Sequence, residues 1–314
     1  MTIRIVQGTK PSPLAELSAQ YLVHCRARGL VPKTLQQYRH SIDAVLLPWC
    51  EAQGITEIGQ LNQRQLDAFT VMLHDHRTAS GKPLSRSSIR TYIRPVGLML
   101  NWARRVGEDV TAKPQMPRRE RQARDVLSRE ELDLLEAAVP SERDKLIIRI
   151  FADCGLRLNE LTQLNADDII KTYGKHYLRV LGKRDRTRDV PIPLELLHRL
   201  ERHIAERPND RISEAIFLAY RGTRLGEHLA LTSGGVYQVV KEAVARAGIT
   251  KRVYPHLLRH SWMTELLRNG LSADQISPIA GASPAVISEC YAHLNRDDGH
   301  DAMLRALSAR RTRR

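Results

Sequence analysis

The chain has 314 residues, of which 42% are hydrophobic, and this length predicts two domains with separate cores. No apolar run is long enough to span a bilayer, and residues 1–8 lack the pattern of a secretory signal, so we expect a cytoplasmic protein with no membrane partner. A net charge of +14 and an isoelectric point near 10.0 favour a polyanionic partner, with nucleic acid preferred because no basic helix with membrane anchors stands out.

The first third of the chain has the apolar spacing of helices. One helix is expected from Pro13 to a C-cap near Gly29, and Thr34 is expected to cap a second. A third begins near Gln63, and Ser85 caps a fourth. Residues 1–110 are therefore predicted to form a helical domain.

The fourth of these helices carries a basic stripe on its polar face. The stripe consists of Arg86, Arg90, Arg94 and Arg104. A solvated face is the ordinary explanation of such a stripe. Because the chain is so basic, contact with a DNA backbone is favoured here.

Residues 111–125 interrupt the helical pattern. The segment contains two prolines and five basic residues, among them Arg118 and Arg119, and it shows no apolar periodicity. It is predicted to be an extended basic interdomain linker that can cross a phosphate backbone, although a plain flexible linker fits the same composition.

The second domain is expected to cover residues 126–299. It opens with a capping box at Ser128 and Glu131, and Ser141 begins another helix. Two strand-like runs, 177–181 and 189–192, predict a β-hairpin whose tip at 182–188 is basic. The remainder is mostly helical and ends in a C-terminal helix and basic tail at 300–314. The fold class is thus mainly α with a small β-sheet, an α+β fold of two domains.

The four cysteines are scattered along the chain, with no CxxC pair and no clustering with histidine. We interpret them as reduced core residues and predict no metal site and no cofactor.

Five side chains suit attack by a tyrosine on a phosphodiester without metal. The non-bridging oxygens need positive cover, and guanidinium groups match them bidentately, which Arg157 and Arg259 could do. His256 lies three residues before Arg259, so both would share one helix face. Lys183 adds an ammonium group and Tyr291 a phenol.

As an ordered set, these residues resemble the tyrosine recombinase (Xer/phage integrase) family. The family pattern is Arg with Glu three residues later, Lys on a hairpin, His-x-x-Arg and then Tyr. Arg157, Glu160, Lys183, His256, Arg259 and Tyr291 match it in order. Residues 33–38 also resemble the family's core-binding domain, so the resemblance covers nearly the whole chain.

The resemblance implies a role for each matching residue. Tyr291 would be the nucleophile that forms a 3′-phosphotyrosyl link, and His256 would help to remove its proton. Lys183 would be the general acid, with Arg184, Arg186 and Arg188 as rivals at the same hairpin tip. Arg157 and Arg259 would stabilise the transition state, and Glu160 would orient a basic residue. His260 and His293 are expected to be structural. Candidate DNA contacts are Lys33, Arg86, Arg90, Arg94, Arg118, Arg119, Arg184 and Arg186.

The sequence departs from the family at Ala282. Nine residues before the tyrosine the family has His or Trp, which donates a hydrogen bond to the scissile phosphate. Loss of one such donor costs about 2.7–4 kcal/mol of transition-state stabilisation. An active enzyme with slower cleavage is expected, or one with a compensating donor such as Ser283, His293 or the backbone N–H groups of the next helix.

The implied function is a site-specific DNA recombinase for integration, excision, resolution or transposition, working without ATP or metal. Its partner would be double-stranded DNA with paired half-sites, bound by a homotetramer that could be monomeric in solution. The segment 301–307 would form a small amphipathic helix that docks on a neighbouring subunit or packs back on its own domain. Two alternatives stay open: an impaired DNA-binding accessory protein of the same family, and a type IB topoisomerase-like enzyme.

Overall fold

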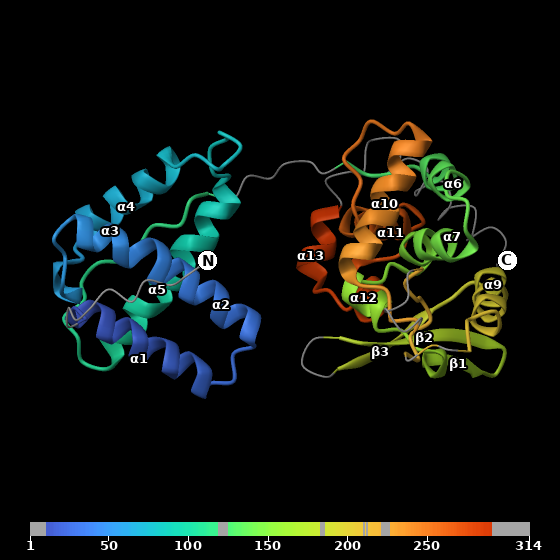
Figure 1. Ribbon diagram of the computed structural model, residues 1–314, viewed down its shortest axis with the longest axis horizontal. Helices are drawn as coiled ribbons and strands as arrows, with labels where there is room; N and C mark the ends of the chain where they lie inside the picture. The colour runs from blue at the N-terminus through green and yellow to red at the C-terminus, as the bar shows by residue number, and fades with distance from the viewer. Residues whose placement is uncertain are drawn as a thin grey trace, which may run out of the picture. The chain divides into compact units, whose positions relative to one another are not determined.

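The computed structural model describes residues 11–118, 125–182, 186–209, 211, 213–220 and 227–290. The chain divides into two compact units, Met1–Gln122 and Ala123–Arg314. Figure 1 gives the element labels. Among the described residues, no helix is both long and apolar enough to cross a membrane.

The regular elements of unit 1 are all helices or helical turns. These are α1 (Pro13–Ala27), α2 (Pro32–Ser41), α3 (Leu47–Ala52), α4 (Gln63–Asp75) and α5 (Arg86–Arg105), with a π-helical turn at Ile42–Leu46 and a 3-10 turn at Ile58–Gln60. Side-chain oxygens cap three of the helices: Ser12 accepts from the N–H of Ala15, Asn62 from that of Gln65, and Ser85 from that of Ser88.

One expected cap in unit 1 is wrong. The helix α2 begins at Pro32 with Val31 as its N-cap, so Thr34 lies inside the helix. Proline fits the first helical position because its fixed φ is helical and its missing N–H would have no partner there. The sequence Val-Pro therefore starts the helix two residues before the threonine.

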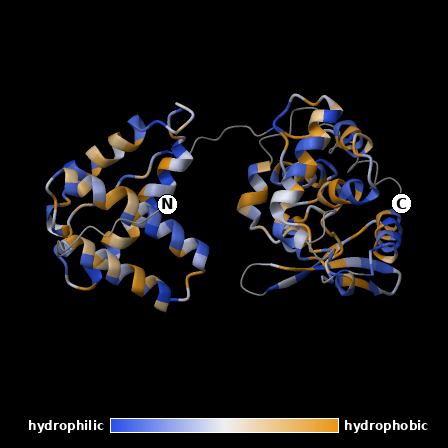
Figure 2. Ribbon diagram, viewed as in Figure 1, coloured by the Kyte–Doolittle hydropathy of each residue, from blue (hydrophilic) through white to orange (hydrophobic). Residues whose placement is uncertain are grey.

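The core of unit 1 gathers around α5. Ile89, Ile93, Met99 and Leu100 of this helix are almost fully buried, and they pack against apolar residues of α1, α4 and the π-helical turn. Figure 2 shows the same pattern as hydrophobic and hydrophilic residues that alternate around each helix. Amphipathic spacing in the sequence is thus enough to explain this bundle.

Unit 2 combines helices with a small sheet. Its elements are α6 (Arg129–Ala137), α7 (Glu142–Arg149), a π-helical turn (Ile150–Cys154), α8 (Leu158–Thr162), a 3-10 turn (Ala166–Asp168), β1 (Ile169–Thr172), β2 (Lys175–Leu181), β3 (Thr187–Pro191), α9 (Leu194–Ala205), α10 (Ser233–Ala247), α11 (Pro255–Arg268), α12 (Ala273–Ala280) and α13 (Pro284–Ser288). The capping box at Ser128 and the cap at Ser141 are both present. The expected class, mainly α with a small β-sheet, is confirmed.

The sheet is an antiparallel meander in the order β1-β2-β3. Leu178 of β2 pairs with Ile169 of β1 and with Val190 of β3, which fixes the register of all three strands. The strand β1 was not predicted. It is joined to β2 by a tight turn in which Tyr173 and Gly174 both have positive φ, 48° and 73°.

The helix α11 is the central element of unit 2. Ten of its 14 residues are buried, which is expected of a helix covered on nearly all sides by other elements. It packs against the π-helical turn that follows α7, and against α10 and α12. The HLLRH segment at 256–260, which carries His256 and Arg259, occupies its first two turns.

Candidate active site

The site is built on the sharp turn that leads into α8. Gly155 has φ +58°, and a Cβ atom there would lie 2.1 Å from the ring of Trp262, so only glycine fits. Two residues later, Arg157 is the N-cap of α8, and its backbone N–H donates to Glu160 Oε2 at 2.7 Å. The turn thereby directs the Arg157 side chain away from the core of the unit, where it is 29% exposed.

Glu160 is a buried carboxylate between two guanidinium groups. Its side chain is only 4% exposed. Oε1 accepts from Arg157 Nη1 and from Arg188 Nη1, both at 2.6 Å, and Oε2 accepts from Arg188 Nη2 at 2.8 Å. The expectation that Glu160 pairs with a basic residue thus agrees with the geometry, with two such residues in place of one.

The charge of Glu160 is maintained by these hydrogen bonds. Burial alone raises the pKa of a carboxyl group, but the hydrogen bonds from the Arg188 side chain and the Arg157 backbone, with the charge of Arg188, outweigh it and lower the pKa to about 2. Glu160 is therefore an anion at any pH at which the protein functions, and it can hold both arginines in fixed orientations.

Arg259 is the most deeply buried of the site's arginines. It is 2% exposed, and its Nη1 and Nη2 donate to the carbonyl oxygens of Gly155 and Ala280. Burial, followed by the nearby charge of Arg157, lowers its pKa to about 10, which leaves it protonated at neutral pH. Arg157, Arg188 and Arg259 therefore form one cluster of three guanidiniums around a single carboxylate.

The altered family position borders this cluster. Arg157 Nη2 donates to the carbonyl of Gly281. Gly281 is the C-cap of α12, with a left-handed φ of +60°, and Ala282 is the next residue. The carbonyl of Ala282 accepts from the Ser277 hydroxyl at 2.9 Å. The next helix, α13, begins after Ser283, whose side chain makes no capping hydrogen bond, while its carbonyl accepts the N–H groups of Val286 and Ile287.

His256 lies one helical turn before Arg259 on α11, as its spacing predicts. Its side chain is exposed, whereas that of Arg259 is buried. Lys183, Arg184, Tyr291 and His293 lie outside the described residues. The last described residue, Cys290, is buried, with its Sγ 3.3 Å from Nδ1 of His260, and the nucleophile candidate Tyr291 follows it in the sequence.

Arg188 is a site residue whose position the sequence reasoning missed. It was expected at the hairpin tip as a rival of Lys183, but it is the second residue of β3 and its side chain is 11% exposed. A signal was present: Arg188 and Val190 are two residues apart, so both point to the buried face of the strand. Arg186, by contrast, is exposed.

The candidate DNA contacts of unit 1 differ in their exposure and in the protein groups to which they donate. Lys33, Arg86, Arg94 and Arg118 are exposed, and Arg119 lies outside the described residues. Arg90 donates to the carbonyl of Pro117, and Arg104 donates to those of Val110 and Ala112. Arg104, the last residue of the basic stripe, thus stabilises the segment that follows α5 in unit 1.

Cysteine, histidine and acidic side chains are the usual protein ligands of a metal ion. Cys25, Cys50, Cys154 and Cys290 are all buried thiols outside any disulfide. Within the described ranges, no three His, Cys, Asp or Glu side chains are grouped so as to hold a metal ion.

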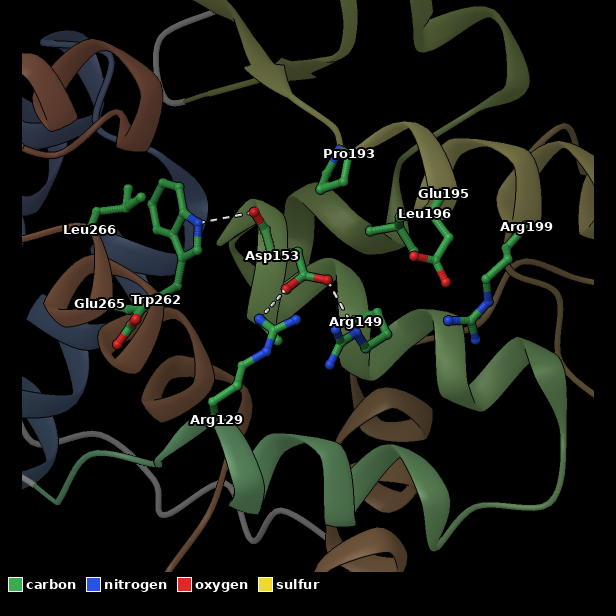
Figure 3. Close-up of a pocket in the computed structure, with 11 residues that line it drawn as sticks. Arg129, Arg149, Asp153, Pro193, Glu195, Leu196, Arg199, Trp262, Glu265 and Leu266 are labelled. Carbon is green, nitrogen blue, oxygen red and sulfur yellow. Dashed lines mark hydrogen bonds and ion pairs between the residues drawn. The ribbon is translucent and has the colours of Figure 1, made fainter. Parts of the chain in front are cut away.

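A pocket of about 350 Å³ is lined in part by Trp262, Glu265 and Leu266 of α11. In Figure 3 the indole N–H of Trp262 donates to the Asp153 carbonyl, and the Asp153 carboxylate pairs with Arg129 and Arg149. These contacts fix the π-helical turn that precedes Gly155. The residues that line the pocket therefore stabilise the turn on which the active site is built.

Comparison with known proteins agrees with this geometry. Residues 125–297 match the phage integrase family. The chain is 30% identical over 298 residues to the tyrosine recombinase XerD of Corynebacterium glutamicum, which covers 90% of this chain and 94% of that protein. It is 29% identical over 282 residues to XerC of Pseudomonas fluorescens, with 88% and 90% covered. The chain belongs to the phage integrase family, as its resemblance implied, and within it to the tyrosine recombinases.

Solved structures share the fold. A XerH recombinase bound to its palindromic difH substrate superposes with a TM-score of 0.69 at 19% identity, over 91% of this chain and 83% of that one. The Tn1549 transposon integrase in complex with transposon right-end DNA gives 0.67 at 17% identity, over 94% and 99%. Both proteins thus share the fold of this chain.

Proposed function

We propose that the protein is a site-specific recombinase that cleaves and rejoins double-stranded DNA through a 3′-phosphotyrosyl intermediate. The observation that carries this proposal is the guanidinium cluster of Arg157, Arg188 and Arg259 around buried Glu160. Such a cluster supplies fixed positive charge where a pentacoordinate phosphate needs it, and the charge does not depend on solvent reorganisation.

Each of these side chains has a role in the cleavage step. The Tyr291 hydroxyl attacks the scissile phosphorus, the bond from phosphorus to the 5′ oxygen breaks, and Lys183 gives a proton to that leaving oxygen. The exposed His256 at the start of α11 accepts the tyrosine proton or contacts the phosphate. Arg157 and Arg259 cover the non-bridging oxygens. Reversal by a second 5′-hydroxyl rejoins the strands without ATP, because the phosphotyrosine conserves the bond energy.

The partner is duplex DNA with two half-sites, and the working assembly is a homotetramer on that DNA. Two findings support this: the charge of +14, and the structure of a lambda integrase tetramer bound to a Holliday junction, which shares this fold with a TM-score of 0.63. The helical residues 1–110 would be the core-binding domain, 111–125 the linker, 126–299 the catalytic domain and 300–314 the C-terminal helix and tail. A cytoplasmic site of action follows from the DNA substrate.

A nicked suicide duplex tests the proposal. Its sequence is obtained by selecting, from a randomised duplex pool, the molecules that the protein binds. After incubation and denaturation, wild-type protein is expected to migrate as a covalent adduct with the labelled strand, and Tyr291→Phe is expected to bind the duplex without forming any adduct.

Two other outcomes would overturn the proposal. Tight binding to the selected duplex with no adduct would indicate a DNA-binding accessory protein. Relaxation of arbitrary supercoiled plasmid, with no recombinant product from paired selected sites, would indicate a topoisomerase-like enzyme.

A further inference from the structure

We propose that Arg188 is a positioning residue for DNA cleavage: acting through the carboxylate of Glu160, it holds Arg157 in the orientation that meets the scissile phosphate. This inference rests on the proposed function. The residue touches no reacting atom in this scheme, and its effect is exerted on another arginine.

All three nitrogens of the Arg188 guanidinium are occupied inside the protein. Nη1 and Nη2 donate to the two oxygens of Glu160, at 2.6 and 2.8 Å, and Nε donates to the carbonyl of Ile279 at 2.7 Å. The side chain is 11% exposed. Arg259 donates to neutral carbonyls, whereas the charge of Arg188 is paired with a buried carboxylate. The function of Arg188 must therefore be found among its protein contacts.

The carboxylate of Glu160 divides its hydrogen bonds evenly between the two arginines. Each oxygen accepts one bond from Arg188 and one from Arg157, the latter from Nη1 and from the backbone N–H. Four bonds fill the lone pairs of a carboxylate. Removal of Arg188 would leave half of them empty on a buried anion, and the carboxylate would then be free to turn away from Arg157.

Arg188 also fixes the other neighbour of Arg157. Its bond to Ile279 holds the end of α12, and at Gly281 a Cβ atom would lie 3.1 Å from the Arg188 side chain. Arg157 donates to the carbonyl of that same Gly281. The two contacts that orient the Arg157 guanidinium, Glu160 and Gly281, are therefore both braced by Arg188.

The placement of Arg188 on β3 adds a link to the hairpin. The strand β3 begins at Thr187, four residues after Lys183, so the strand that leaves the hairpin tip is tied to the arginine cluster. The same brace can in this way keep the general-acid hairpin and Arg157 in register.

The test compares Arg188→Lys and Arg188→Met with a matched control on the same sheet. Arg179 of β2 also pairs bidentately with a carboxylate, Asp189, at 3.0 and 3.2 Å, but the pair is exposed and lies outside the arginine cluster. Arg179→Lys and Arg179→Met therefore repeat the chemical change without touching Glu160. Circular dichroism and binding to the selected duplex are measured first, and cleavage is measured for the variants that remain folded. Lysine keeps the charge and one contact to Glu160, so it covers the case in which methionine prevents folding.

The measurement is the single-turnover rate of adduct formation on two suicide duplexes. One carries the natural phosphate at the scissile position, and the other a methylphosphonate, in which one charged oxygen is replaced by a methyl group. On the phosphate, the Arg188 variants are expected to be slower than wild type by about 100-fold, the cost of a displacement near 1 Å, with duplex binding unchanged. On the methylphosphonate this loss is expected to shrink about tenfold, because less charge needs the cover that Arg157 supplies.

Each outcome decides a different point. If wild type forms no adduct on the phosphate duplex, the proposed function fails and the inference fails with it. If wild type forms the adduct but the Arg188 variants react as fast as the Arg179 variants, only the inference is wrong. An equal loss on both duplexes would make Arg188 a general structural residue and would also overturn it.

Discussion

Glu160 is an anion because two arginines donate to it, and its ionisation should make the free energy of unfolding depend on pH. Since its pKa is lowered from 4.5 to about 2, the charged form stabilises the folded state above pH 4.5, and this contribution is lost as the pH falls toward 2. The full contribution is about 3 kcal/mol. The free energy of unfolding of Glu160→Gln, measured with urea from pH 7 to pH 3, is therefore expected to lie well below that of wild type at pH 7 and to approach it as the pH falls.

Asp189→Asn is the control for this titration. Its carboxylate pairs with Arg179 at the surface, where both side chains are at least 40% exposed, so its contribution is small. A gap between wild type and Glu160→Gln that stays constant from pH 7 to pH 3 would contradict the assigned ionisation.

In the family pattern, the position that corresponds to Ala282 carries a hydrogen-bond donor, which alanine cannot supply. Ala282→His is expected to accelerate adduct formation on the suicide duplex by about 10²-fold if no other group donates there, which is the usual value of one such donor. The single-turnover rate is the measurement, with Ala282→Phe as a control for added bulk without a donor.

A compensating donor would give a different result. Ser283 follows Ala282, and its hydroxyl does not cap α13. If Ala282→His leaves the rate unchanged and Ser283→Ala slows cleavage, the hydroxyl has replaced the missing donor. Acceleration by histidine and no effect of Ser283→Ala would contradict compensation.

The family pattern predicts Arg157, Glu160, His256 and Arg259 as site residues from their order and spacing, and the structure brings Arg157 and Glu160 into contact. The burial of Arg188 was missed because the expected strand began at Asp189, which left Arg188 in the tip, whereas β3 begins at Thr187. The pairing of Val180 with Arg188 settles the register of β3, and it depends on hydrogen bonds between strands.

At the scale of elements, the turn at Gly155 leads to Arg157 and accepts a hydrogen bond from Arg259. Gly155→Ala would force a methyl group into the ring of Trp262 and place an alanine at φ +58°. Overpacking costs about 1–3 kcal/mol, and the left-handed backbone adds about 1–2 kcal/mol. We expect a loss of about 2–5 kcal/mol in urea unfolding, together with slower cleavage, because the Gly155 carbonyl is an acceptor for Arg259.

Gly248→Ala separates strain from crowding. Gly248 ends α10 with φ +65°, and a Cβ atom there would meet nothing within 4 Å. Only the backbone penalty of about 1–2 kcal/mol applies, and cleavage is expected to stay at the wild-type rate. Equal losses of stability for the two variants would show that contact with Trp262 does not matter.

The elements that the sequence predicted are those with long periodic faces or strong caps, such as α5 after Ser85 and α6 after Ser128. The four-residue strand β1 was missed, since Ile169–Thr172 is too short to show alternation and gains its place by pairing with β2. Local signals therefore define the helices, while the sheet depends on contacts between segments.

At the scale of the whole molecule, the net charge of +14 does not show which basic residues bind DNA and which stabilise the protein. Arg94 is exposed on α5. Arg104, on the same helix, donates hydrogen bonds to the backbone carbonyls of Val110 and Ala112. The plot of log affinity against log salt concentration, measured with a duplex of arbitrary sequence, distinguishes the two classes because each phosphate contact contributes about 0.9 to its slope.

Arg94→Gln is accordingly expected to reduce the magnitude of that slope by about 1. Arg104→Gln is expected to leave the slope unchanged and to lower the stability of unit 1 by about 1–3 kcal/mol, since two backbone carbonyls lose their donor. The thermal midpoint of each variant provides the second measurement. If both variants keep the wild-type slope, the polar face of α5 does not meet the phosphate backbone, and the DNA-binding charge of unit 1 must lie on other exposed basic residues such as Lys33 and Arg118.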